Sequence, residues 1–358
     1  ELHQQIKSSG NISVPIRLDR NRPENSADLF GVKLGFPYSP VLCLSRFAID
    51  QKVVIILDQL DAIRWTAMHS NNALQVCQEL IRQVINLRKN GVDITVVLAC
   101  RDFELDEDVA LKSWINSLGD EVAEIKLSVL DDEAVSDLIK PYEKFETLSR
   151  EKQQVLAIPL WLSIYLMIAN RDKVAPQFTN KLELVKRFWD DRFKEALSLG
   201  ISEDSARQLV DDVIVLMNSK ARLSVPESAL DISSVKTLEA LISVGVLTRQ
   251  SRQISFRHQA LFDYQVGRRL FNAALHSSDQ LIKELGGKSQ QTLTKREHLK
   301  YALNMALDYG QAEFCNASLS VLKSNEVRFH LKYLVFNSLK ELTELKGPAR
   351  KMIDTIVE

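Results

Sequence analysis

The stretch VVIILDQLD, residues 53–61, is a continuous run of mostly β-branched apolar residues that ends in an acid. Such a run predicts a strand buried on both faces, as in parallel sheets that are covered by helices. Asp58 is then placed at the carboxyl end of the strand, and ligands bind at this edge of open α/β sheets. The alternative is structural, with Asp58 only capping the segment that follows.

Strand-like and helix-like segments alternate around this stretch. The other predicted strands are Ile12–Leu18, Ile94–Ala99 and Ala123–Leu127, and the predicted helices are Ser39–Ile49, Asn72–Lys89 and Val109–Leu118. Strands that alternate with helices predict a parallel α/β sheet.

The pattern after Leu130 is almost entirely helical. Residues 155–169 form the longest uncharged run, which contains Pro159 and is shorter than the roughly 20 residues of a membrane span. We therefore expect a buried helix there and no membrane segment. Residues 246–256 predict a short β-hairpin between helices, as in a winged helix, and amphipathic helices are expected from Ser278 onward.

Composition excludes several classes of protein. Twelve glycines and nine prolines in 358 residues exclude collagen-like and Pro-rich chains and disfavour turn-dense all-β folds. The 46 basic residues balance 47 acidic ones, which argues against bulk attraction to nucleic acids or membranes.

The four cysteines are far apart and predict reduced thiols in a cytosolic protein. Four histidines without ligand-like spacing are expected to be ordinary surface or core residues: His69, His276, His298 and His330.

Further polar residues follow the predicted strands in a recognisable order. Arg101 directly follows the second buried strand, Pro159 opens an apolar helix, and His258 stands between a strand and a helix in FRHQALFDY, residues 256–264. The motifs therefore come in a fixed order: a strand followed by DQLD, a strand followed by CR, a proline that opens a helix, and F-x-H-x-x-x-x-D-Y. This order resembles that of the STAND NTPases, and within them the NACHT-like branch. The resemblance covers roughly residues 1–275, and its strength lies in the order of motifs that are individually weak.

The resemblance implies a role for each of these residues. Asp58 would be the Walker B acid that holds Mg²⁺, and Asp61 the second acid of the same motif. Arg101 would be the sensor arginine, and Pro159 would pack near the adenine. His258 would contact the β-phosphate of ADP and hold the closed state.

Two departures from the family pattern stand out. Ala62 occupies a place where NACHT proteins usually carry glutamate, so hydrolysis is expected to be slow or absent. The phosphate loop G-x-x-x-x-G-K-[ST] is also missing, because Ile282 stands where the first glycine should precede Gly286-Gly287-Lys288-Ser289. The family order predicts that residues 1–358 start just after the phosphate loop and its strand in a longer protein. The alternative is a protein that never had this loop.

The resemblance also implies an architecture and a function. The expected parts are a truncated α/β nucleotide domain at 1–140, a helical domain at 141–200, a winged helix at 201–275 and C-terminal helices at 276–358, which would start a sensor array. The function implied is a cytoplasmic signalling ATPase switched by ADP and ATP with Mg²⁺, which self-associates when an unknown trigger binds and acts in bacterial antiphage defence. Residues 1–358 alone are expected to bind ATP weakly or not at all, because amides of the phosphate loop supply most phosphate contacts.

Two other classes of function stay open. An AAA+-like or winged-helix regulator would bind DNA through a group of arginines around the hairpin: Arg249, Arg252, Arg257, Arg268 and Arg269. In that case His258 would be merely structural. The third class is an interaction scaffold whose NTPase core never turns over.

Overall fold

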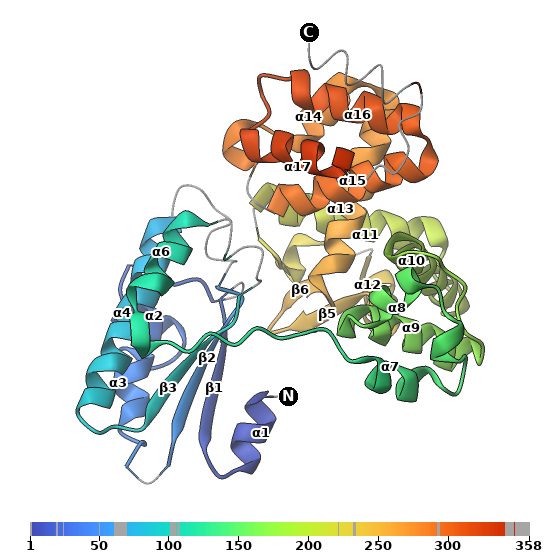
Figure 1. Cartoon of the computed structure of the whole chain (residues 1–358). Coiled ribbons are helices and arrows are strands. Elements are labelled where there is room, and N and C mark those ends of the chain that lie inside the picture. Colours follow the sequence, from blue (N-terminus) through green and yellow to red (C-terminus); the bar gives the residue numbers. More distant parts are fainter. Residues whose placement is uncertain are drawn as a thin grey trace. The chain divides into compact units, whose positions relative to one another are not determined.

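A computed structural model describes residues 2–18, 21–23, 25–49, 51–60, 70–100, 105, 108–220, 222–231, 234–291, 294–340 and 347. The chain divides into two compact units, Glu1–Lys126 and Leu127–Glu358 (Figure 1).

A parallel sheet of three described strands forms the centre of the first unit. Its strands are β1 (Ile12–Arg17), β2 (Val53–Asp58) and β3 (Ile94–Leu98), in the spatial order β1-β2-β3. The register joins Ile12 to Val53 and Val53 to Ile94. The apolar residues of β2 are at most 9% exposed, which confirms the prediction of a strand buried on both faces.

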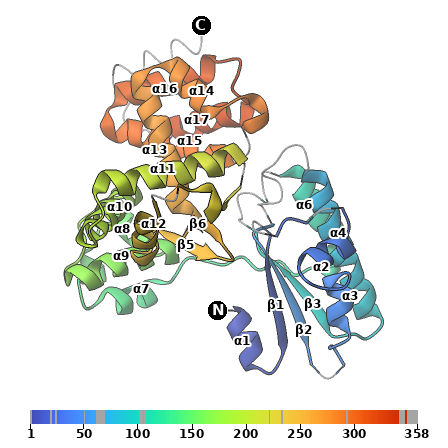
Figure 2. The ribbon, with the colours of Figure 1, turned by 180° about the vertical axis from the view of Figure 1, so that it is seen from behind.

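Helices cover the sheet of the first unit. α2, α3, α4 and α6 lie on one side of the sheet and α1 on the other (Figures 1 and 2). Their bounds are α1 Leu2–Ser8, α2 Ala27–Lys33, α3 Pro40–Ser45, α4 Ser70–Lys89 and α6 Val109–Ser117. The predicted helix Ser39–Ile49 is shorter than expected, since turns follow Ser45.

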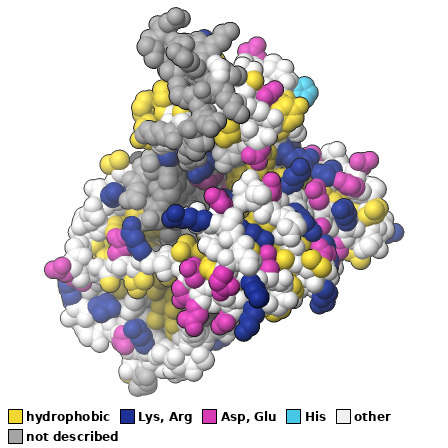
Figure 3. All heavy atoms as spheres, turned by 45° about the vertical axis from the view of Figure 1, so that its right-hand side comes forward, with side chains coloured by type: hydrophobic (Ala, Val, Ile, Leu, Met, Phe, Trp, Pro, Cys, Tyr) yellow, Lys and Arg dark blue, Asp and Glu magenta, His cyan; other side chains and the backbone are white. Residues whose placement is uncertain are grey.

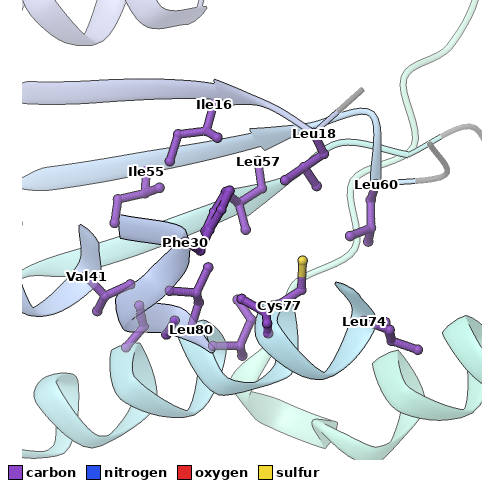
Figure 4. Packing of buried hydrophobic residues seen from close by; sticks show 14 of the residues in the cluster. Ile16, Leu18, Phe30, Val41, Ile55, Leu57, Leu60, Leu74, Cys77 and Leu80 are labelled. Carbon is purple, nitrogen blue, oxygen red and sulfur yellow. The ribbon is translucent and has the colours of Figure 1, made fainter. Parts of the chain in front are cut away.

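The core of this unit lies between the sheet and the helices on one side. Phe30 of α2 and Val41 of α3 meet Ile55 and Leu57 of β2, and Leu80 of α4 packs among them (Figure 4). The long helix α4 places its apolar residues at helical spacing on this inner face, as the sequence predicted.

The predicted strand Ala123–Leu127 is wrong. These residues have no regular secondary structure, and Ile125 and Leu127 are 81% and 94% exposed. An alternating apolar segment becomes a strand only when a neighbouring backbone accepts its hydrogen bonds. None of the described strands pairs with residues 123–127, and the chain passes from the first unit into the second within this segment.

The second unit begins with helices that pack around an aromatic core. They are α7 Asp132–Ile139, α8 Arg150–Leu156, α9 Pro159–Asp172, α10 Lys181–Ser198 and α11 Glu203–Lys220. Phe188, Trp189 and Phe193 of α10 are at most 2% exposed, in agreement with the prediction that this stripe is core. Short 3₁₀ turns lie at Gly119–Glu121 in the first unit and at Phe145–Thr147, Glu227–Ala229 and Lys288–Gln290 in the second.

A small antiparallel sheet follows these helices. Its strands β4 (Val225–Pro226), β5 (Leu247–Gln250) and β6 (Gln253–Phe256) have the order β4-β6-β5, and α12 (Val235–Ser243) precedes the hairpin. Ser251 and Arg252 join β5 to β6 with φ of 50° and 60°, as a two-residue type I′ turn requires. The order α11, β4, a 3₁₀ turn, α12, β5, β6 places the predicted hairpin between helices.

Five helices complete the second unit. They are α13 Gln259–His276, α14 Ser278–Leu285, α15 Thr294–Tyr309, α16 Gln311–Lys323 and α17 Phe329–Lys340. A separate apolar cluster, which includes Leu270, Leu299 and Phe314, holds them together.

The predicted α/β class is confirmed: a parallel sheet covered by helices precedes a mostly helical part that holds a small antiparallel sheet. Of the described helices, no single one is long and apolar enough to cross a membrane. Only α8 and α9 taken together reach that length and apolarity, and they meet at 99°. The boundaries of the four predicted domains stay predictions.

Candidate functional site

Asp58 ends β2 at the carboxyl edge of the parallel sheet. The backbone on both sides of it is fixed, because Leu18 N donates to Asp58 O at 3.0 Å and Leu60 N donates to Ala99 O at 2.9 Å. The side chain of Asp58 is half-buried. Within the part of the chain that the structure describes, its carboxylate has no hydrogen bond or ion pair. A half-buried carboxylate without a partner retains the capacity to bind a cation or a polar ligand.

The residue after Asp58 has an unusual backbone. Gln59 has φ of 60°, in the left-handed region that residues other than glycine, asparagine and aspartate rarely adopt. Leu60, only 1% exposed, anchors the chain directly after it. Strained backbone of this kind clusters at functional sites, because the surrounding fold must hold it in place.

Arg17 is a further residue at this edge, and sequence reasoning missed it. It ends β1, and the register pairs it with Asp58. Side chains of paired residues in neighbouring parallel strands project from the same face of the sheet. The signal in the sequence was a cation at the end of a predicted strand, but only the register shows which acid it accompanies.

Two predicted site residues, Asp61 and Arg101, lie outside the described residues. Cys100, which precedes Arg101, is half-buried and packs against the core of the first unit. The structure therefore tests neither the second acid nor the sensor arginine.

Pro159 and His258 belong to the second unit. Pro159 is the first residue of α9, where a missing N–H costs nothing, and its side chain is exposed. The next turns of α9 are buried, with Trp161 and Leu162 at 4% and 2% exposure.

His258 stands between β6 and α13. It is the N-cap residue of α13, but its side chain makes no capping hydrogen bond and is exposed. Arg257 N donates to Val246 O at 3.0 Å, and Leu261 N donates to His258 O at 3.0 Å, so the backbone on both sides is held. Partial burial of the ring and the nearby Arg257 lower the pKa of His258. The neutral form of the ring is thus favoured at pH 7, and it can donate one hydrogen bond and accept another.

Acidic partners neutralise two of the five arginines around the hairpin. Arg249 Nη2 lies 2.7 Å from both Glu227 Oε1 and Glu239 Oε1, and Arg269 Nη2 lies 3.0 Å from Glu284 Oε1. On the face shown in Figure 3, basic and acidic side chains are interspersed.

The prediction of reduced thiols agrees with the structure, in which Cys100 is half-buried and the other three cysteines are buried. Cys43, Cys77 and Cys315 are buried free thiols. Burial raises the pKa of Cys77 to about 12, so this thiol is not reactive. The described residues contain no group of three or more potential metal ligands of the His, Cys, Asp or Glu type.

No family model matches this chain, and no curated protein matches it. Among solved structures, it is similar to the Walker-type ATPase PABY2304 of Pyrococcus abyssi, with 13% identity over 71% of this chain and 84% of that chain and a TM-score of 0.30. It is also similar to the ORC2 protein of Aeropyrum pernix in its ADPNP–ADP complexes, with 12% identity, 71% and 76% coverage and a TM-score of 0.24. Identities and TM-scores this low do not establish a shared function.

Proposed function

We propose that this chain carries the acid and histidine sides of a nucleotide switch, in an ATPase of the STAND type and its NACHT-like branch. The observation that carries the proposal is Asp58, a half-buried carboxylate without a described partner, at the carboxyl edge of a parallel sheet beside Arg17. This edge is where open α/β sheets bind ligands.

A magnesium nucleotide fits the described residues in part. Asp58 offers the single hard oxygen ligand that Mg²⁺ needs when phosphates and water complete its shell. Bound Mg²⁺ would neutralise phosphate charge. A phosphate loop is absent from the sequence of residues 1–358, so the proposal requires one from elsewhere in the protein.

The chain's own residues have distinct tasks in this proposal. Asp58 holds the cation, Arg17 adds positive charge at the same edge, and the left-handed turn at Gln59 redirects the backbone directly after Asp58. His258 is neutral and exposed, so its ring is able to donate one hydrogen bond to a phosphate oxygen. Asp61, Arg101 and Pro159 keep their predicted roles as second acid, sensor and adenine neighbour.

The other parts of the proposal follow from the family resemblance alone. The full protein would be cytoplasmic, would self-associate when a trigger binds and would exchange ADP for ATP on opening. A role in antiphage defence belongs to the same inference.

Calorimetry on a form of the protein that includes a phosphate loop tests the proposal. We expect MgATP and MgADP to bind. Asp58→Asn should weaken the Mg²⁺-dependent part of the nucleotide affinity about tenfold or more, since a charged ligand of the cation is lost. Asp120→Asn, an exposed acid in the 3₁₀ turn at Gly119–Glu121, is the matched control. An absence of nucleotide binding in that form favours the scaffold class instead.

His258→Ala separates the switch from the DNA-binding alternative. Loss of the contact that closes the switch would give self-association without a trigger. Loss of DNA affinity with unchanged nucleotide response would contradict the switch. The pairing of Arg249 and Arg269 with carboxylates leaves fewer free cations for DNA than the sequence suggested.

A further inference from the structure

A histidine and an aspartate from two helices form a buried hydrogen bond in the second unit. His298 Nε2 on α15 lies 3.0 Å from Asp263 Oδ1 on α13, and the two residues are 2% and 4% exposed. Because a carboxylate only accepts, Nε2 carries the proton and donates it to the bond. Burial lowers the pKa of His298, which favours the neutral ring. Within the described residues, Nδ1 has no partner, so this bond alone fixes the ring through polar contact.

The two helices approach each other closely at the same place. A Cβ at Gly267 of α13 would overlap the Cβ of Tyr301 and would lie 3.0 Å from the backbone oxygen of His298. Glycine at this position therefore lets α15 approach the backbone of α13 one turn after Asp263. Such contact leaves little freedom for one helix to slide along the other.

Aromatic contacts continue from His298 toward the hairpin. The ring centroid of His298 lies 5.4 Å from that of Phe262, and Phe262 lies 5.7 Å from Phe256. Phe256, the last residue of β6, in turn lies 6.3 Å from Trp189 of α10. Phe256 and Phe262 thus anchor the two sides of the turn that holds His258.

We propose that the Asp263–His298 hydrogen bond is the contact by which the C-terminal helices hold the junction between β6 and α13, which makes both residues positioning residues for His258. α15 then biases the exposed histidine through a continuous chain of packed groups, from His298 through Phe262 to Phe256. This inference rests on the proposed function only for the role of His258 toward nucleotide. The coupling itself is a property of the nucleotide-free chain.

Two substitutions of His298 separate the hydrogen bond from packing. His298→Leu removes the donor, whereas His298→Gln retains an N–H that can reach Asp263. Leu299→Ala is the matched control, since it opens a cavity at the next residue of α15 in the C-terminal core. The reporters are the backbone amides of Arg257 and Leu261, which flank His258, and the amide of Leu162 in α9 serves as the reference.

We expect His298→Leu to speed hydrogen exchange at Arg257 and Leu261 roughly ten- to a hundredfold more than at Leu162, as loss of a hydrogen bond to a charged group implies. His298→Gln should return both rates to within about threefold of the unmodified chain.

Three results would overturn the inference. Exchange at Arg257 and Leu261 could rise no more in His298→Leu than in Leu299→Ala. His298→Gln could behave like His298→Leu, which would assign the effect to ring shape. If His298→Leu does not fold, Asp263→Asn takes its place, because it weakens the hydrogen bond while keeping an acceptor. Unchanged hydrogen exchange at Arg257 and Leu261 in Asp263→Asn would contradict the proposal. All these measurements use residues 1–358 without nucleotide. Their outcome therefore does not depend on whether nucleotide binding is found by calorimetry.

Discussion

Arg17 and Asp58 stand side by side at the carboxyl ends of two neighbouring parallel strands, as the last pair of the β1–β2 register. Both are half-buried, and the next backbone contact, from Leu18 N to Asp58 O, keeps the two chain ends together. The pair brings one positive and one negative side chain to the edge where a charged ligand with its cation would bind.

Arg17→Gln should therefore weaken nucleotide binding in a form of the protein that includes a phosphate loop. We expect about a tenfold loss of affinity, the lower range for a hydrogen bond to a charged group, because Arg17 is partly solvated. Titration calorimetry at two salt concentrations measures it, and the loss should shrink at high salt. Lys52→Gln, at the amino end of β2, serves as control. Equal nucleotide affinities for the Arg17 and Lys52 variants would show that Arg17 does not belong to the binding site.

Gln59 offers a test of backbone strain beside Asp58. Glycine tolerates φ of 60°, whereas a β-branched residue does not. Gln59→Gly should be neutral or stabilise the first unit by up to about 1 kcal/mol, and Gln59→Val should destabilise it by roughly 1–3 kcal/mol. Urea unfolding, followed by a probe in the first unit, measures both. Similar stabilities of the two variants would show that no strain is stored at this turn.

Gly267 should not tolerate a side chain. The Cβ of alanine would overlap Tyr301, whose Cβ belongs to a packed helix, so the helices must separate. Gly267→Ala should cost roughly 1–3 kcal/mol in the free energy of unfolding, as overpacking does. Gly287→Ala is the control, because its Cβ would meet nothing within 4 Å and its φ is −64°. Thermal unfolding of both variants checks the difference, and equal melting temperatures would contradict the close packing of α13 on α15.

The stability of the second unit should fall on acidification through His298. Its pKa in the folded chain is below the ordinary 6.5 because the ring is buried. As the pH falls, the unfolded chain therefore binds a proton at a higher pH than the folded chain does. The contribution of His298 to the free energy of unfolding is fully present above about pH 6.5 and decreases as the pH falls through the folded pKa. His258 has a lowered pKa as well and acts in the same direction.

Urea midpoints at pH 7.5 and pH 5 measure this dependence. His298→Gln should flatten it markedly, and His258→Gln should do so only slightly, because His258 is exposed. An unchanged pH dependence in His298→Gln would assign the acid sensitivity to other groups. Asp263, Lys295 and Glu297 are the charged groups that act on His298.

The local sequence was sufficient for much of the first unit. The continuous apolar run of β2 is buried on both faces as predicted, and the spacing in α4 matches one helix face. The similar run of β3 was predicted to be buried as well, but only Ile94 is buried and the other residues of β3 are half-buried. Residues 123–127 show where local pattern stops being sufficient. Their alternation is that of a strand, but pairing needs an edge that local sequence does not supply.

By itself, the sequence determined the alternating α/β order, the helical second half, the hairpin at 246–256 and the position of Asp58 at a strand end, because these depend on neighbours a few residues apart. Only the tertiary structure decided that Arg17 accompanies Asp58 and that His298 donates to Asp263. These pairs are separated by 41 and 35 residues, respectively. Register and helix packing bring them together, and both are set by the fit of whole buried faces, which no single segment encodes.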